Sequence, residues 1–176
     1  MKLIVASDIH GSYFYTKKLE ELIKKENPDK ILLLGDILYH GARNALPCEY
    51  STIDVIETLN QYADKIIAVR GNCDSEVDDM VAGFGLVADY EKIEVDGRTF
   101  YLTHGHLMNK YEELFKDHYV LSGHTHVYQM EGKNINPGSV GIPKVNKEHT
   151  CLVYENGEFQ LINLDDFSVI KRKKLD

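Results

Sequence analysis

Side chains of metal-ligand type follow five apolar stretches of this sequence, each time beside a glycine. In chain order the five segments read "DIHG" (8–11), "GD" (35–36), "GNCD" (71–74), "THGH" (103–106) and "GHTH" (123–126). A single histidine or aspartate after a strand is usually a structural residue. Five such segments in one chain instead indicate a common site, because glycine lets the backbone turn sharply beside each ligand.

The residue types in these segments indicate which ions could bind there. Aspartate, asparagine and histidine offer oxygen and nitrogen atoms, which suit Mn²⁺, Fe, Co²⁺ or Zn²⁺ better than a site of thiolates would. Seven such ligands are too many for one ion that keeps an open position, but they suit two ions that share a bridging carboxylate. Paired ions about 3.5–4 Å apart stabilise the attacking and leaving oxygens of an in-line displacement.

Three buried strands are expected to position the first of these ligands. Apolar runs at 2–8, 30–36 and 65–72 are short and rich in β-branched residues, which is typical of buried strands. Helical periodicity between them gives a β-α-β-α-β order, which predicts a parallel sheet with right-handed crossovers. The carboxyl ends of such strands meet at one edge of the sheet, where ligands bind.

The two helices between these strands are amphipathic. The first is expected from Tyr15 to the residues before Pro28, since proline disfavours helix in the residue that precedes it. Ser51 or Thr52 can cap the second. The second helix is expected to carry four apolar residues: Ile53, Ile56, Leu59 and Ala63.

The second half of the chain has a different pattern. Asp96-Gly97 and Asn156-Gly157 each separate two strand-like runs, which is a strong hairpin signal. A further strand and loop are expected at 119–126. A helix between them would carry Met108, Tyr111, Leu114 and Phe115. A half with parallel strands and a half with hairpins fit together as two facing sheets with helices outside.

Composition narrows the classes of function. The 176 residues fit one domain, 1–176, and their formal charge of −8 argues against a general nucleic-acid binder. No apolar run approaches the roughly 18 residues that span a membrane. Three widely separated cysteines without a CxxC motif predict reduced thiols and a cytoplasmic protein. The basic run at 171–174 is expected to be a solvated tail.

The ordered segments "DIHG", "GDILYHG", "RGNCD", "THGH" and "SGHTH" resemble the calcineurin-like metallophosphoesterase superfamily. The stretches "HGARNALP" and "NPGSV" further resemble its YfcE-type phosphodiesterases. This resemblance implies a single metallophosphoesterase domain with an α/β fold, a four-layer α/β/β/α sandwich of two mixed sheets flanked by helices. It also implies a hydroxide that bridges two metal ions and attacks the phosphorus of a small phosphodiester.

The resemblance assigns a role to each ligand position. Asp36 would bridge the two ions. One ion would be held by Asp8, His10, Asp36 and His126, and the other by Asp36, Asn72, His104 and His124. Mn²⁺ is the expected ion, with Fe, Zn²⁺, Co²⁺ and Ni²⁺ as alternatives. The resemblance also implies a homodimer or homotetramer.

The sequence departs from the superfamily pattern at two places. An Asp-Arg pair that usually follows the second motif is replaced by Tyr39 and His40, and Arg43 could either supply the missing positive charge or be a surface residue. A histidine that protonates the leaving oxygen or stabilises the transition state is replaced by Cys73, whose alternative role is that of an inert thiol. The catalytic acid therefore stays unassigned. Four residues are candidates for contacts with the substrate: Cys73, Arg43, His40 and His106.

Two other functions remain open at this point. The first is a non-catalytic scaffold, similar to the retromer subunit that shares the fold. Loss of the metal ligands from the sequence would indicate this function. The second is a dimetal hydrolase of another phosphoester, such as a nucleotide pyrophosphate. The acidic composition makes nucleic acid the less favoured substrate.

Overall fold

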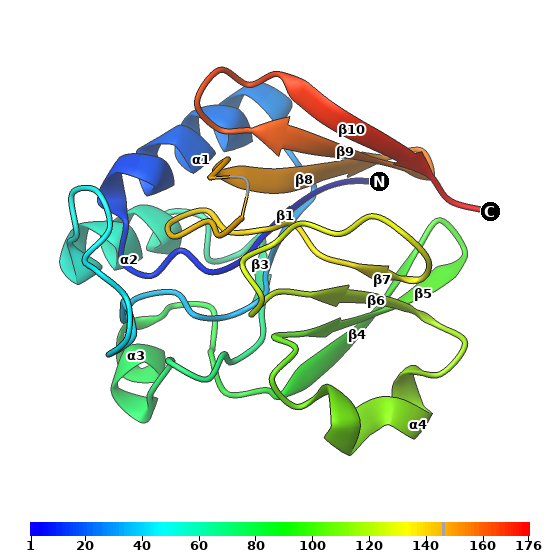
Figure 1. Ribbon diagram of the computed structural model, residues 1–176, viewed down its shortest axis with the longest axis horizontal. Coiled ribbons are helices and arrows are strands. Elements are labelled where there is room, and N and C mark those ends of the chain that lie inside the picture. The colour runs from blue at the N-terminus through cyan, green and yellow to red at the C-terminus, as the bar shows by residue number, and fades with distance from the viewer. Residues whose placement is uncertain (146) are drawn as a thin grey trace.

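A computed structural model of the chain describes residues 1–145 and 147–176, whose strands form two sheets (Figure 1). The larger sheet has the strand order β10-β9-β8-β1-β2-β3. Its strands are β1 (Lys2–Ala6), β2 (Lys30–Leu33), β3 (Ile66–Ala68), β8 (Thr150–Glu155), β9 (Glu158–Asn163) and β10 (Val169–Lys174). The smaller sheet has the order β4-β5-β6-β7. Its strands are β4 (Tyr90–Val95), β5 (Arg98–Thr103), β6 (Tyr119–Ser122) and β7 (Asn134–Ile135).

Both sheets are mixed, as the sequence predicts. In the larger sheet β1, β2 and β3 are parallel, whereas β8 pairs antiparallel with both β1 and β9. In the smaller sheet β5 and β6 are parallel, and β4 and β5 form the hairpin expected at Asp96-Gly97. The carboxyl ends of β1, β2 and β3 therefore lie along one edge, and those of β5 and β6 lie along another.

Helices cover the outer faces of the two sheets (Figure 1). The long helix α1 (Tyr13–Glu26) and α2 (Thr52–Asn60) lie against the larger sheet, and α3 (Glu76–Val81) follows β3. A 3₁₀ turn, η1 (Met108–Tyr111), and α4 (Glu112–Phe115) pack on the smaller sheet through Tyr101 and Val120.

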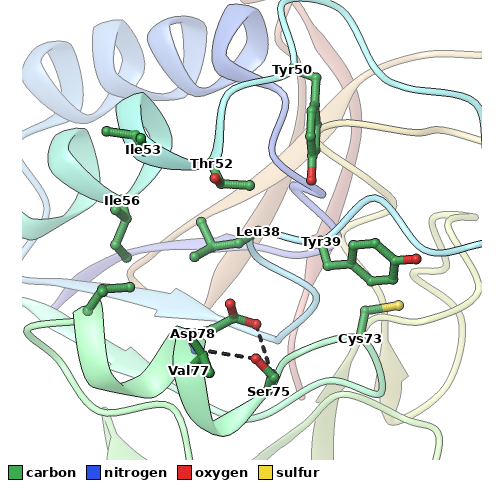
Figure 2. Close-up of a pocket in the computed structure, with 11 residues that line it drawn as sticks. Leu38, Tyr39, Tyr50, Thr52, Ile53, Ile56, Cys73, Ser75, Val77 and Asp78 are labelled. Atoms are coloured by element: carbon green, nitrogen blue, oxygen red, sulfur yellow. Dashed lines mark hydrogen bonds between the residues drawn. The ribbon is translucent and has the colours of Figure 1, made fainter.

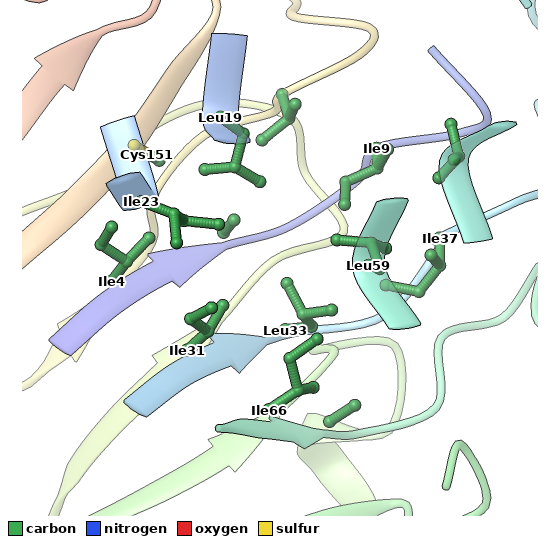
Figure 3. Packing of buried hydrophobic residues seen from close by; sticks show 14 of the residues in the cluster. Ile4, Ile9, Leu19, Ile23, Ile31, Leu33, Ile37, Leu59, Ile66 and Cys151 are labelled. Atoms are coloured by element: carbon green, nitrogen blue, oxygen red, sulfur yellow. The ribbon is translucent and has the colours of Figure 1, made fainter. Parts of the chain in front are cut away.

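Successive side chains of the buried strands point to opposite faces of the sheet and so pack into different layers. In β1, Ile4 and Ala6 face the helices, as Figure 3 shows for Ile4 beside Leu19 and Ile23. Leu3 and Val5 point the other way, into a core shared with the smaller sheet. With the third cluster under η1 and α4, each pair of adjacent layers has its own core. The predicted four-layer α/β/β/α sandwich is thereby confirmed.

The second helix differs from its prediction in detail. Ser51 is the cap, since its Oγ accepts a hydrogen bond from the backbone N–H of Asp54 at 3.3 Å. Ile53 is 67% exposed, and Ala63 lies beyond the end of the helix. The helix buries Val55, Ile56, Thr58 and Leu59, so Val55 takes the place on the buried face that was expected for Ile53.

Two other expectations were wrong. The single helix expected around 108–115 is a 3₁₀ turn followed by one α-helical turn, and Leu114 is exposed. The basic run at 171–174 is part of β10, an edge strand, and not a solvated tail. Its charges fit an edge position, because Lys171 pairs with Glu131 and Arg172 with Glu158.

Among the described residues, none of the helices combines the length and the hydropathy that a bilayer crossing requires.

Candidate metal centre

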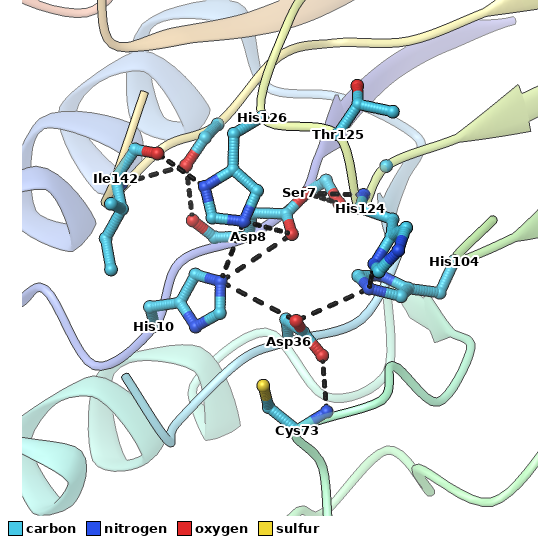
Figure 4. A network of polar contacts seen from close by, with 12 residues as sticks. Ser7, Asp8, His10, Asp36, Cys73, His104, His124, Thr125, His126 and Ile142 are labelled. Carbon is cyan, nitrogen blue, oxygen red and sulfur yellow. Dashed lines mark hydrogen bonds and ion pairs between the residues drawn. The ribbon is translucent and has the colours of Figure 1, made fainter. Parts of the chain in front are cut away.

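The segments predicted as ligands lie together at the carboxyl ends of five strands. β1, β2 and β3 lead into the first three segments, and β5 and β6 lead into the last two. In Figure 4 the side chains from these segments point toward one another, with Asp36 between His10 and His104. The fold thus brings residues from positions 8 to 126 into one polar cluster.

One side of the cluster is formed by Asp8, His10 and His126. The Nε2 atoms of the two histidines are 3.2 Å apart. The Oδ1 atom of Asp8 lies 3.3 Å from Nε2 of His126 and 3.7 Å from Nε2 of His10. These three side chains form one of the groups whose ligand atoms lie within 4.8 Å of each other.

The other side is formed by Asn72, His104 and His124. Nε2 of His104 lies 3.1 Å from Oδ1 of Asn72 and 3.2 Å from Nδ1 of His124. The Oδ2 atom of Asp36 lies 3.4 Å from Nε2 of His104 and 3.6 Å from Nε2 of His10. Asp36 therefore touches both sides of the cluster, as a bridging ligand must.

Backbone carbonyl groups orient three of the histidines. Nδ1 of His10 hydrogen-bonds the carbonyl of Tyr39, and Nδ1 of His104 that of Leu34, each at 2.7 Å. Nδ1 of His126 bonds the carbonyl of Ile142. A carbonyl accepts, so each Nδ1 donates its N–H, and in the neutral imidazole the Nε2 lone pair is left facing the centre of the cluster.

The orphaned oxygen of Asp8 shows that a cation fits here. Its Oδ2 accepts hydrogen bonds from Ser7 and from the backbone N–H of His124, but the buried Oδ1 has no hydrogen-bond partner. A buried carboxylate oxygen that faces imidazole lone pairs is unfavourable unless a positive charge lies between them. A divalent ion with oxygen and nitrogen ligands would supply that charge.

The pKa values of His104 and Asp36 reflect the attraction between these two side chains. Burial lowers the pKa of His104, but hydrogen bonding and attraction to Asp36, together with Asp8, outweigh burial and raise it to about 9. Burial likewise opposes ionisation of Asp36, yet His104 holds the pKa of that carboxyl well below its usual range. The carboxylates thus favour positive charge beside them, whether as a proton or as a metal ion.

Most of the candidate ligands have left-handed backbone conformations. The φ angles of Asp8, His10, Asp36, His124 and His126 lie between 51° and 69°. This region is sparsely populated for residues other than glycine, although aspartate, asparagine and histidine enter it most readily. The turns that aim these side chains inward are therefore strained.

Several residues that support the ligand loops were not found from the sequence. The Asp74 carboxylate accepts the backbone N–H groups of Asp36 (2.7 Å), Ile37 (2.8 Å) and Gly71 (2.7 Å), which ties the loops after β2 and β3 together. Ser139 of the "NPGSV" stretch donates its hydroxyl to the backbone carbonyl of Asp8 at 2.8 Å. Most of these contacts join segments far apart in sequence, which local sequence patterns do not reveal.

The four candidates for substrate contacts have different positions. Arg43 lines a pocket of about 340 Å³ together with the ligands His10, Asp36, Asn72, His124 and His126. Lys144 lines it too and was missed, because no nearby motif marks it. His106 lies beside His104, with ring centroids 5.3 Å apart, whereas His40 packs between Tyr39 and Tyr50.

Cys73, for which an inert role was one alternative, lies directly beside candidate metal ligands. Its Sγ falls within 4.8 Å of ligand atoms of His10 and Asp36, and its backbone N–H donates to Oδ1 of Asp36 at 2.8 Å. Burial, and then the negative charge of Asp36, raise the pKa of the thiol to about 12. The surrounding protein groups thus favour the neutral thiol at this position.

Gly71→Ala should damage the centre without unfolding the protein. A Cβ at this position would lie 2.1 Å from Oδ1 and 2.4 Å from the backbone nitrogen of Asp36. The Asp36 loop must therefore shift, and a displacement near 1 Å is expected to lower kcat by about 10²-fold. Phosphodiester hydrolysis and circular dichroism would measure the two effects.

Gly83→Ala is the matched control for this variant. Its Cβ would lie no closer than 3.2 Å to a neighbour, Oδ1 of Asn60. Equal activity of the two variants would contradict the close packing of Gly71 under Asp36.

Comparisons with known proteins identify the family of this chain. The profile of the calcineurin-like phosphoesterase superfamily domain matches residues 1–158. The chain is 42% identical to phosphodiesterase YfcE of Escherichia coli (strain K12) over 176 residues, which cover 97% of this chain and 96% of that protein. A solved structure of YfcE, described as a phosphoesterase from E. coli, superposes with a TM-score of 0.90 at 38% identity and full coverage of both chains.

More distant structures share the fold alone. Vacuolar protein sorting 29 from Cryptosporidium parvum has a TM-score of 0.64 at 16% identity, covering 98% of this chain and 97% of that one. The family profile and the 42% identity over nearly the whole length carry the assignment. The chain belongs to the calcineurin-like phosphoesterase superfamily.

Proposed function

We propose that this chain is a metal-dependent phosphodiesterase that hydrolyses a small phosphodiester at the cluster around Asp36. The observation that carries the proposal is the convergence of seven ligand side chains, with Oδ2 of Asp36 within 3.6 Å of histidines on both sides. The near full-length identity to phosphodiesterase YfcE supports the same reaction class.

The cluster is proposed to hold two divalent ions, Mn²⁺ in preference to Fe, Zn²⁺, Co²⁺ or Ni²⁺. The residues proposed for the first ion are Asp8, His10, Asp36 and His126, and those for the second are Asp36, Asn72, His104 and His124. Such a pair of ions activates water as a nucleophile at neutral pH and neutralises charge on the phosphoryl group. The nitrogen and oxygen donor set supports this choice of metals.

Basic side chains of this chain would position the phosphate. Arg43 and Lys144 line the same pocket of about 340 Å³ as the proposed ligands. A guanidinium can bind two phosphoryl oxygens at once, which fixes the orientation of the ester before attack. Arg43 would thereby replace the arginine that the superfamily places three residues earlier, at the position of His40.

The site offers a weak proton donor where the leaving group departs. Cys73 is a neutral thiol beside Asp36, and a thiol is a poorer general acid at neutral pH than an imidazole. Substrates with leaving groups that need little protonation are therefore favoured. This supports diesters of acidic alcohols or phenols over simple alkyl monoesters.

The alternative of a non-catalytic scaffold has less support. A scaffold does not require a complete ligand set, whereas all seven side chains are present here and lie together. Hydrolysis of another phosphoester, such as a nucleotide pyrophosphate, uses the same centre. A panel of diesters, monoesters and pyrophosphates, assayed with Mn²⁺, tests the proposal, and absence of hydrolysis of every diester would overturn it.

Cys73→Ala and Cys73→His separate the thiol's possible roles. The alanine variant should leave hydrolysis of bis(p-nitrophenyl) phosphate nearly unchanged, because nitrophenolate departs without a proton. The histidine variant should raise monoester hydrolysis relative to diester hydrolysis, by up to about 10²-fold, the low end for a positioned acid. The gain is limited because the Asp74 carboxylate already accepts three backbone N–H groups and is not free to orient the new imidazole.

The measurement is the ratio of kcat/KM for mono- and bis(p-nitrophenyl) phosphate in wild type and both variants. A large loss of diester hydrolysis in Cys73→Ala, with metal content unchanged, would show that the thiol takes part in the reaction. An unchanged ratio in a folded Cys73→His would remove the missing acid as the cause of selectivity.

We further propose one domain over residues 1–176, a cytoplasmic location and a homodimer or homotetramer. Pairing of β10 with β9 supports a domain that includes the last strand. Three free thiols, of which Cys48 is exposed, support a reducing compartment. Light scattering of the purified chain tests the oligomeric state.

A further inference from the structure

A largely apolar pocket of about 490 Å³ lies between α2 and α3 (Figure 2). Leu38 forms its floor, Ile53 and Ile56 come from α2, and Val77 and Val81 come from α3. Ile53 and Val77 are each 67% exposed and Val81 is 49% exposed. Apolar side chains are thus gathered around a hollow of a size typical for small-molecule sites.

Two lining residues connect this pocket to the candidate metal centre. The carbonyl of Tyr39 accepts the hydrogen bond from Nδ1 of His10 at 2.7 Å. The backbone N–H of Cys73 donates to Oδ1 of Asp36, and Sγ of Cys73 lies within 4.8 Å of ligand atoms of His10 and Asp36. In Figure 2 Tyr39 and Cys73 lie together at one end of the pocket. The pocket therefore begins a few ångströms from the proposed ligands.

Charge divides the surface around the centre into two parts. Arg43 and Lys144 line the pocket that contains the ligands, where the phosphoryl group would lie. No lysine, arginine or histidine is among the residues that line the apolar pocket, and its one carboxylate is Asp78. That carboxylate accepts the backbone N–H of Ser75 at 2.8 Å within the capping box of α3. An anionic group would be repelled from the apolar pocket.

We propose that this pocket binds one ester arm of the phosphodiester, and that the arm is uncharged and apolar, of the size of a phenyl or branched alkyl group. This inference rests on the proposed phosphodiesterase function and adds the substrate class. The phosphate enters the basic pocket and its arm extends past Cys73 between α2 and α3. The substrate is then an aryl or alkyl diester, and a substrate with a second phosphate on this arm is excluded.

Two substrates with one leaving group test the proposal: methyl p-nitrophenyl phosphate and phenyl p-nitrophenyl phosphate. Val77→Ser and Ile53→Ser remove apolar contacts from two walls of the pocket, and both side chains are exposed, so the fold should persist. Met80→Ser is the matched control, because Met80 lies on the same helix as Val77, is 83% exposed and does not line the pocket.

We expect each lining variant to lower kcat/KM for the phenyl diester by about 3- to 20-fold, mainly through KM, as a few apolar contacts are lost. Met80→Ser should match wild type. If kcat/KM falls only for the phenyl diester, the phenyl arm, which is not the leaving group, lies in the pocket. If kcat/KM falls equally for both substrates, the nitrophenyl leaving group lies there. Either result supports the proposal.

Lining variants that match Met80→Ser on both substrates would overturn the proposal while leaving the phosphodiesterase function intact. If Val77→Ser instead changes the molar mass in light scattering and leaves the kinetics unaltered, the pocket is an interface between copies of the chain. Failure of the wild type with Mn²⁺ to hydrolyse either diester would remove the phosphodiesterase function itself.

Discussion

Asp36→Asn is expected to lower kcat/KM for bis(p-nitrophenyl) phosphate by at least about 10³-fold, because it removes the negative charge on which both proposed ions depend. Oδ2 of Asp36 lies 3.6 Å from Nε2 of His10 and 3.4 Å from Nε2 of His104, so one substitution affects both sides of the cluster. Asparagine keeps the shape of the side chain and an oxygen that can accept the N–H of Cys73. The fold should therefore survive.

Elemental analysis of the purified variant measures the central part of this expectation. Metal content should fall from two ions per chain to one or fewer, while circular dichroism stays like that of wild type. Asp64→Asn is a suitable control, since Asp64 is exposed and lies in the turn before β3. Two ions per chain in Asp36→Asn would refute its assignment as the bridge.

Removal of metal by a chelator should abolish hydrolysis, and Mn²⁺ should restore it at least as well as Zn²⁺. The seven proposed ligands offer oxygen and nitrogen atoms, so no thiolate favours the softer ions. Occupied sites also stabilise the folded state, because the ions bind the native cluster and not the unfolded chain. The melting temperature of the stripped protein should therefore rise when Mn²⁺ is added.

Activity and melting temperature measured on the same stripped sample make this test independent of assay conditions. Cys73→Ala is the control for the nearby thiol, whose Sγ approaches His10 and Asp36. If that thiol binds the softer ion, the variant will lose Zn²⁺ reactivation but keep Mn²⁺ reactivation. Hydrolysis that survives exhaustive chelation, or that no divalent ion restores, would disprove the dimetal mechanism.

The parts of the fold that follow local patterns could be predicted from the sequence. In β1 and β2, alternate side chains pack into two different cores, so successive positions are all apolar. Such continuous apolar runs mark buried strands. β10 escaped prediction because only Ile170 packs against the core from within that strand, and an edge strand with solvated charges reads like a tail. The turns at 108–115 were read as one helix because their apolar residues keep a helical spacing across a break.

The candidate site also has residues that local sequence patterns predict and residues that they do not. The ligands could be found because each of the five segments that hold them follows a strand and contains a glycine. Asp74 was read as a ligand type, yet its carboxylate accepts backbone N–H groups of the turn after β2 and of its own turn after β3. Lys144 and the apolar pocket were missed, because their places depend on which loops and helices the fold brings side by side. Such long-range contacts have no periodicity that a sequence can reveal.

The left-handed backbone of five proposed ligands has a consequence for protein engineering. Each such residue costs on the order of 1 kcal/mol relative to an unstrained position, and five together approach the lower end of the net stability of a domain. Glycine at His126 or His124 would relieve that strain in the metal-free chain. A screen that rewards heat resistance alone would therefore accumulate glycines at the ligand positions and discard the enzyme, so thermostabilisation of this protein must be selected with metal bound and turnover measured.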